Sequence, residues 1–261
     1  MSGYRAISAR YGAEREAEIA LIYVTEPMDR ATRIKDDASR DPVSVMKLNF
    51  SEKFMTGIYP YSVLTSVFCP VDKFREERFT PAKLTLSVQE WCGHVMLGLW
   101  PSPGGARLKG MSYFASEGDV DTALAAPDGV LYEDALLIQL RELDGPFAGG
   151  AAEWSGPLVP RLWSHRQAHA ALAVESAKIT RKNVSDAIVR FEMSYRDVVK
   201  SYDVERGAER RIVAWQSNDG SKARLVKSER LAYWTMNGPG NEAAREKIGL
   251  DPGGRILPFD S

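Results

Sequence analysis

The chain of 261 residues carries 34 Lys and Arg against 35 Asp and Glu, and no long run of one sign. This balance gives no electrostatic support for a nucleic-acid or anionic-membrane partner. No run of roughly 18 apolar residues occurs, which excludes a transmembrane helix. The polar first segment, MSGYRAISARYGAERE, lacks an apolar run before a small-residue cleavage site, so the sequence predicts no signal peptide.

Short apolar or alternating runs dominate the first half and predict β-strands. Residues 17–25 (AEIALIYVT) are rich in β-branched side chains, as in a buried strand. Apolar and polar residues alternate over 43–50 and 63–69, which predicts two more strands. The longest strand is expected over 82–100, and after the turn PSPGG residues 108–116 form its return strand.

The segment 132–143 (YEDALLIQLREL) differs, because its leucines recur at spacings of three and four before Gly145-Pro146. This pattern predicts a helix. The Gly-, Ala- and Pro-rich stretch that follows is the best candidate boundary between an N-terminal half, 1–148, and a C-terminal half, 149–261. One continuous domain is the alternative.

The second half predicts an antiparallel meander. The alternation over 189–196 is the cleanest in the chain, so Phe191 and Tyr195 are expected to be buried and Arg190 and Arg196 exposed. Further strands are expected over residues 202–205, 211–216 and 223–228. Near the end, Asn241 is the expected N-cap of a short helix that Gly249 ends. The predicted fold is mainly β: a strongly curved antiparallel sheet, or two half-barrels, with a few short helices.

The hexapeptide QEWCGH (residues 89–94) is the densest group of reactive residue types. In a strand, Glu90, Cys92 and His94 would point to the same side. Cys92 and His94 could then share a metal or act as thiolate and imidazole, but no third ligand for a zinc site is in reach. The favoured interpretation is structural: a glycine bulge where the sheet becomes covered on both faces, with Trp91 and Cys92 buried and His94 bonded to Glu90.

Other motifs give no reaction either. His165 and His169 have a spacing of four but lack the glutamate base of a metalloprotease, and the nearby Pro160 makes a helix there doubtful. The glycine pairs are followed by no phosphate-binding pattern. Cys69 and Cys92 could form one disulfide, although two thiols in a reducing compartment fit equally well. No cofactor and no catalytic or structural metal is therefore expected.

Aromatic side chains are frequent on the predicted strands of the first half. Tyr59, Tyr61, Trp91 and Tyr113 exceed what a simple strand core needs. They are expected to line an apolar cavity of a few hundred Å³ on the concave side of that half. The alternative is that they belong to the core.

The segments RYGAERE, LIYVTEP, VMKLNF, FMTGIYPYSVLTSVFCPVD and SVQEWCGH together resemble a family of uncharacterised bacterial proteins. These proteins are usually exported or lipid-anchored, and some carry a septum-formation-inhibitor label. The nucleotide pyrophosphatases of that label begin with Ser-x-Ser-Pro-Arg-Arg, which is missing here, so their activity is not implied. The strand pattern is also similar to periplasmic half-barrels that carry lipids or lipoproteins.

The leading functional prediction is a non-enzymatic binding protein of the bacterial envelope that holds a lipidic or amphipathic small molecule. Its ligand-binding residues would be Tyr59, Tyr61, Trp91 and Tyr113. One alternative is a thiol-dependent or other hydrolase centred on Cys92 and His94 with Glu90, and another is a structural interaction module. The resemblance implies the periplasm or the outer membrane, whereas a chain complete as given would be cytoplasmic.

Overall fold

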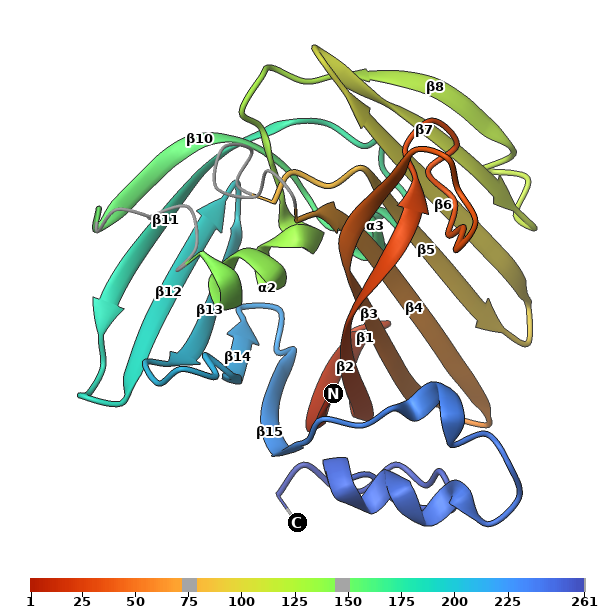
Figure 1. Cartoon of the computed structure of the whole chain (residues 1–261), viewed down its shortest axis with the longest axis vertical. Coiled ribbons are helices and arrows are strands. Elements are labelled where there is room, and N and C mark those ends of the chain that lie inside the picture. The colour runs from red at the N-terminus through yellow and green to blue at the C-terminus, as the bar shows by residue number, and fades with distance from the viewer. Residues whose placement is uncertain (72–78, 144–150, 261) are drawn as a thin grey trace.

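The computed structural model describes residues 1–71, 79–143 and 151–260. The fifteen strands of these residues form one sheet, in the order β8-β7-β6-β5-β4-β3-β2-β1-β15-β14-β13-β12-β11-β10-β9. Neighbouring strands are antiparallel except for β9 and β10, which are parallel. The sheet is bent into an arch, and α2 and α3 lie on its inner side (Figure 1). The prediction of a mainly β, strongly curved antiparallel sheet is confirmed.

The first eight strands form a meander of consecutive hairpins. They are β1 (Ser2–Arg10), β2 (Ala13–Asp29), β3 (Pro42–Thr56), β4 (Tyr59–Pro70), β5 (Lys83–Glu90), β6 (Gly93–Ser102), β7 (Gly105–Ser112) and β8 (Val120–Ala125). The later strands are β9 (Leu131–Tyr132), β10 (Glu153–Val159), β11 (Glu175–Asn183), β12 (Ile188–Tyr195), β13 (Val198–Glu205), β14 (Ile212–Ser217) and β15 (Lys222–Ser228).

The helical segments are short: α2 (Glu133–Glu142), α3 (Leu162–Ala168) and the 3₁₀ segments η2 (Tyr233–Thr235) and η3 (Asn241–Ile248). The leucine spacing predicted α2 correctly. The doubt about a helix around His165 was wrong, because burial of Leu162, Trp163 and Arg166 on one face stabilises α3. In η3 the N-cap is Gly240 rather than Asn241, while Gly249 ends the segment as predicted, with φ of 74°.

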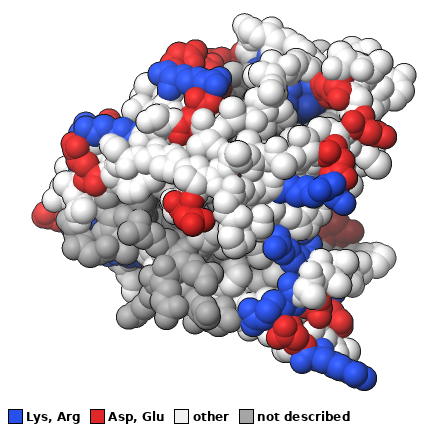
Figure 2. Space-filling view, turned by 90° about the horizontal axis from the view of Figure 1, so that it is seen from above, with Lys and Arg blue, Asp and Glu red and all other residues white. Residues whose placement is uncertain are grey.

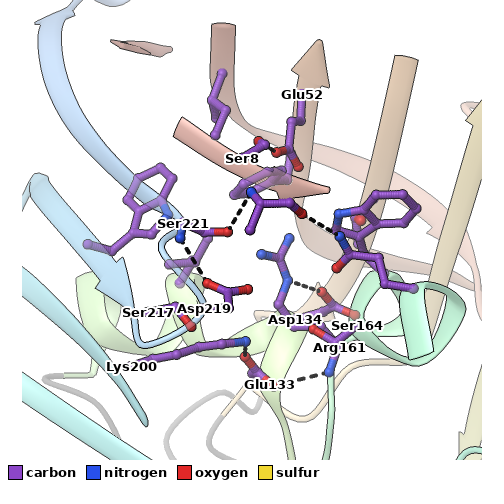
Figure 3. A pocket seen from close by; sticks show the side chains of 18 of the residues that line it. Ser8, Glu52, Glu133, Asp134, Arg161, Ser164, Lys200, Ser217, Asp219 and Ser221 are labelled. Carbon is purple, nitrogen blue, oxygen red and sulfur yellow. Dashed lines mark hydrogen bonds and ion pairs between the residues drawn. The ribbon is translucent and has the colours of Figure 1, made fainter. Parts of the chain in front are cut away.

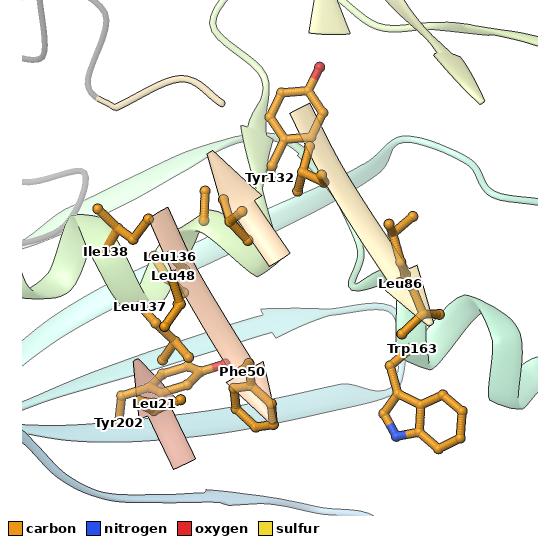
Figure 4. Close-up of a cluster of buried hydrophobic side chains, with 14 of the residues drawn as sticks. Leu21, Leu48, Phe50, Leu86, Tyr132, Leu136, Leu137, Ile138, Trp163 and Tyr202 are labelled. Carbon is orange, nitrogen blue, oxygen red and sulfur yellow. The ribbon is translucent and has the colours of Figure 1, made fainter. Parts of the chain in front are cut away.

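The core lies between α2 and the inner face of the sheet. Every residue from 133 to 140 is buried, and Leu136, Leu137 and Ile138 lie beside Leu21 and Leu48 of the sheet (Figure 4). The helix therefore fills the middle of the arch, where strands from both halves of the chain meet it.

The predicted register of β12 holds for three of its four residues. Phe191 and Tyr195 are buried, and Arg196 is exposed. Arg190 is half-buried instead of exposed, because its guanidinium donates to both oxygens of Asp203 on β13, at 2.6 and 2.7 Å. A cross-strand ion pair thus covers part of the polar face.

The first strand, β1, and the last, β15, meet in the middle of the sheet. β1 pairs with β15 as well as with β2, and the Ser2 and Ser228 hydroxyls lie 2.9 Å apart. A bulge follows Gly3, where an added Cβ would lie 2.1 Å from the Ile248 carbonyl oxygen. Only glycine permits this approach of the C-terminal segment. The predicted boundary at 148/149 lies outside the described residues, and strands from both sides of it share the sheet.

Charged side chains are mixed on the surface. Figure 2 shows acidic and basic groups interspersed on the face it presents, without a continuous area of one sign. Among the described residues, no helix combines the length and the hydropathy needed to cross a membrane.

Candidate functional site

The hexapeptide QEWCGH is a hairpin, not a strand crossing. β5 ends at Glu90, β6 begins at Gly93, and these two residues are paired, so Trp91 and Cys92 form a two-residue turn. The Glu90 carboxylate accepts the Cys92 N–H at 2.6 Å and fixes this turn. The predictions of one strand over 82–100, of a bulge and of buried Trp91 and Cys92 are therefore wrong: both side chains are exposed.

The three reactive groups of the hexapeptide do not form a catalytic unit. His94 Nε2 lies 2.9 Å from the Ser87 hydroxyl, and not against Glu90 as expected. The neighbouring Glu90 carboxylate raises the pKa of the Cys92 thiol, which disfavours the reactive thiolate. Cys69 is buried, and burial raises its pKa as well. Both thiols are free. In the described ranges, no three His, Cys, Asp or Glu side chains gather into a metal-binding group.

Thiol labelling tests this geometry. In the native protein we expect Ellman's reagent to modify Cys92 slowly at neutral pH and faster as the pH rises, since only the thiolate reacts. Cys69 should react only after unfolding. Cys92→Ser should leave no reactive thiol in the folded state, and Glu90→Gln should speed the reaction. Fast modification of Cys92 at neutral pH, or labelling of native Cys69, would contradict the assignment.

Three of the four aromatics predicted to bind a ligand contact one another. The ring centroids of Tyr59 and Tyr61 are 6.0 Å apart, and those of Tyr59 and Trp91 are 6.3 Å apart. Tyr61 also lies 6.4 Å from Trp163 of α3. Tyr113 is separate from them and packs edge-on against Phe114. Tyr59, Tyr61 and Trp91 therefore form one aromatic group with Trp163. None of the four predicted residues lines the groove or the cavity described next.

An apolar groove of about 400 Å³ lies between strands β6, β7 and β8 and the end of α3. We call it the β6–β8 groove. Its lining is mainly apolar, because β6, β7 and β8 and the segment after α3 contribute apolar side chains to it. These side chains are Val95, Leu97, Leu108, Met111, Val120, Leu124 and Leu172. The groove is within the size range of small-molecule sites, roughly 300–1,000 Å³.

Charged groups close one end of the groove. The Glu117 carboxylate bridges from the loop after β7 to α3, with Oε1 2.7 Å from both Arg166 Nη1 and His169 Nδ1. Ser112 donates to its other oxygen at 2.7 Å. Partial burial opposes ionisation, but the hydrogen bonds and Arg166 hold the pKa of Glu117 below its ordinary value. Burial lowers the pKa of His165, which favours its neutral form.

A second, polar cavity of about 70 Å³ lies in the centre of the arch. Figure 3 shows Lys200 and Glu133 meeting on one side of it, and Ser8 and Glu52 on the other. Glu133 Oε1 accepts from Lys200 at 2.5 Å, and Oε2 accepts from the Tyr195 hydroxyl at 2.8 Å. Burial opposes its ionisation, yet Lys200 keeps the pKa of Glu133 below the ordinary range.

Two more acidic groups of this cavity, Asp134 and Glu52, are also held by the protein. Asp134 accepts from Arg161 Nε at 3.0 Å and from the Leu162 N–H at 2.9 Å. Burial raises the pKa of Glu52, which accepts a hydrogen bond from the Ser8 hydroxyl. Since a water molecule takes about 30 Å³, the cavity has room for roughly two. The side chains around it form a hydrogen-bonded network that fixes α2 to β12, β13 and the start of α3.

The groove could not be deduced from sequence periodicity. β8 is an exposed edge strand with a weak alternation, and α3 comes from the opposite half of the chain. The two histidines are the one local signal, since His165 and His169 both line the groove. Their spacing of four was noted, but nothing in the sequence places them beside β6–β8.

No protein-family model matches the chain, and no curated protein matches its sequence. Among solved structures, it is similar to the crystal structure of a β-barrel-like protein of the domain of unknown function DUF1849 from Brucella abortus. The TM-score is 0.50 at 10% sequence identity, over 87% of this chain and 94% of that chain. The likeness gives no support to the septum-formation label or to export. It shows the fold alone: a β-barrel-like sheet shared over most of both chains.

Proposed function

We propose that the protein binds a single-chain amphiphile, with the apolar tail in the β6–β8 groove and the polar head at the Glu117–Arg166–His169 cluster. The observation that carries this proposal is the groove itself, about 400 Å³ with aliphatic walls from three strands and charged groups at one end. Removing an apolar tail from water stabilises such a complex by roughly 25 cal/mol per Å² of buried surface. A place in the bacterial envelope is part of the proposal, on the sequence resemblance alone.

The polar cavity is the weaker candidate for a ligand. Its volume of about 70 Å³ is far below that of ordinary small-molecule sites. Its cationic groups, Lys200 and Arg161, already pair with Glu133 and Asp134. A charged ligand would therefore have to break buried ion pairs before it could bind.

No observation favours the thiol hydrolase. The Cys92 thiol has a raised pKa, and His94 contacts Ser87. An activated nucleophile needs a lowered pKa or an adjacent base. The groove thus remains the best-supported site.

The test is native mass spectrometry of the purified protein, followed by titration with a fluorescent single-chain fatty acid. Thr122 lies on β8, exposed and lining the groove, so Thr122→Arg puts a charge into the apolar wall without disturbing the core. We expect this variant to bind the probe at least about tenfold more weakly, since an unpaired charge faces the tail. Ala125→Arg, on the same strand but outside the groove lining, is the matched control. No saturable binding by the wild type, or equal binding by Thr122→Arg, would refute the proposal.

A further inference from the structure

Four adjacent hairpin ends each expose one large apolar side chain. Tyr11 follows β1, Ile58 joins β3 to β4, Trp91 joins β5 to β6, and Tyr113 follows β7. Their exposed fractions are 60, 79, 68 and 72%. The sheet order places these turns next to one another along one edge. We call these four residues the apolar rim.

Three of the four rim side chains pack against residues of other strands. The Tyr11 hydroxyl lies 2.7 Å from the Tyr61 hydroxyl, and the Trp91 ring stacks on Tyr59. Tyr113 lies over Gly93, where an added Cβ would be 2.6 Å from the Tyr113 Cβ. Large apolar groups are thus held outward, which single scattered surface residues do not explain.

The described loops at the opposite ends of these strands are mainly polar. The loop from β2 to β3 carries the ion pairs Arg30–Asp41 and Lys35–Asp37. At its start the Asp29 carboxylate accepts the Thr32 N–H. The β6–β7 turn is Ser102 to Gly105. Of the two described connections at this end, the β2–β3 loop exposes one large apolar side chain, Ile34, at 61%, among these charged groups. The apolar rim thus carries a row of such side chains, whereas the described part of the opposite end carries one.

We propose that the apolar rim docks on the surface of a lipid bilayer. Neighbouring strands are about 4.8 Å apart, so four adjacent hairpins spread over roughly 30 Å. One side chain per turn along such a line matches a plane better than the compact anchor cluster of a protein partner. Trp and Tyr are also the residues that favour the headgroup region of a membrane.

The groove lies next to the rim, which deepens the proposed function. Met111, Ser112, Ser116 and Glu117 line the groove, and Tyr113 lies between them in the chain. A docked molecule would thus hold the charged end of its groove beside the lipid headgroups, where an amphiphile could exchange. Docking itself depends on the rim and not on an occupied groove.

Charge is balanced around the rim. Glu14 and Lys53 are exposed near it, and Glu90 is engaged in its turn. Apolar contact, rather than attraction to anionic lipid, is therefore the driving force. Binding is expected on zwitterionic lipid and at high salt, since screening weakens only charge interactions.

Flotation with phosphatidylcholine vesicles tests the docking. We expect the wild type to float with the vesicles at low and high salt. The double variant Ile58→Ser with Trp91→Ala should bind the vesicles at least about tenfold more weakly, because two apolar side chains no longer leave water on docking. The matched control is Trp234→Ala. Trp234 is 59% exposed, like the rim residues, but it lies in η2. This segment begins shortly after Glu229, whose N–H donates to the Met1 carbonyl at the end of β1 opposite the rim. This control should float like the wild type.

Two further arms separate the proposals. Thr122→Arg should keep vesicle binding while it loses the fatty acid probe, and the rim variant should keep the probe. Thermal unfolding of the rim variant verifies that it is folded. A wild type that stays in solution, binding that disappears at high salt, or a folded rim variant that floats normally would overturn the docking. The amphiphile proposal would survive each of these results.

Discussion

Lys200→Met is expected to lower the free energy of unfolding by about 3–5 kcal/mol, the usual cost of leaving a buried charge without its partner. The Glu133 side chain is completely buried, and Lys200 is its one cationic hydrogen-bond partner in the described part of the chain. Without the ammonium, the carboxylate keeps hydrogen bonds from the Tyr195 hydroxyl and the Arg161 N–H. The Arg161 guanidinium lies near it but is paired with Asp134, so these contacts do not offset the desolvation of Glu133.

Urea unfolding at neutral pH measures the effect, and Lys182→Met is the matched control. Lys182 pairs with Glu192 on the exposed side of the sheet, where an ion pair contributes at most about 1 kcal/mol. The pKa of Glu133 is lower in the folded state than in the unfolded chain. Its contribution is therefore present above the ordinary carboxyl range and is lost as the pH falls through the lowered value. The difference between wild type and Lys200→Met should shrink in acid. A loss equal to that of Lys182→Met would show that the pair is not buried in solution.

Phe191→Ala is the second large effect, with an expected loss of about 3–5 kcal/mol of unfolding free energy. Phe191 is completely buried on β12, between Arg181 of β11 and Tyr202 of β13. Truncation leaves a cavity that paired strands on both sides cannot close.

The same urea experiment with Val199→Ala provides the control. Val199 belongs to the adjacent strand β13, but its side chain is 50% exposed, so its truncation should cost no more than about 0.5 kcal/mol. Similar midpoints for both variants would mean that the inward register of β12 is wrong.

Sequence periodicity predicted the strands whose two faces meet different surroundings. Phe191 and Tyr195 alternate with polar residues because one face of β12 meets the core and the other meets solvent. β10 escaped prediction because Gly156 and Pro157 interrupt its pattern, and β8 because it is a mostly exposed edge. Such strands owe their existence to pairing with a neighbour, which no local pattern records.

The hairpin at QEWCGH shows how one signal supports two structures. The apolar side chains occupy even-numbered positions around Leu86 and odd-numbered positions around Leu97, a change that led to the prediction of a sheet covered on both faces. A two-residue turn produces the same change, because the paired residues Glu90 and Gly93 differ in parity yet lie on one face. Cys92 at the tip is then exposed, whereas a continuous strand would bury it.

The sites depend on contacts that no sequence spacing contains. Glu133 and Lys200 are 67 residues apart, and the groove joins β6–β8 to His165 and His169 of the second half. Glu133 and Asp134 at the start of α2 do not indicate in the sequence that Lys200 will pair with Glu133. The sequence predicted an apolar cavity in the first half lined by Tyr59, Tyr61, Trp91 and Tyr113. The β6–β8 groove uses strands of that half but none of these four residues, and their ligand role remains a prediction.

The pairing of β1 with β15 also governs the order in which the molecule can be assembled during translation. β1 is made first, but the partner for one of its edges is not synthesised until residues 222–228 appear. Until β15 is made, the nascent chain therefore presents an open strand edge, on which strands of other molecules can pair. Pairing β1 with β15 then joins segments 226 residues apart, such as Ser2 and Ser228, whose hydroxyls are in contact. Contacts of such long range make folding slow, so this step leaves the chain dependent on protection from aggregation until its last strand arrives.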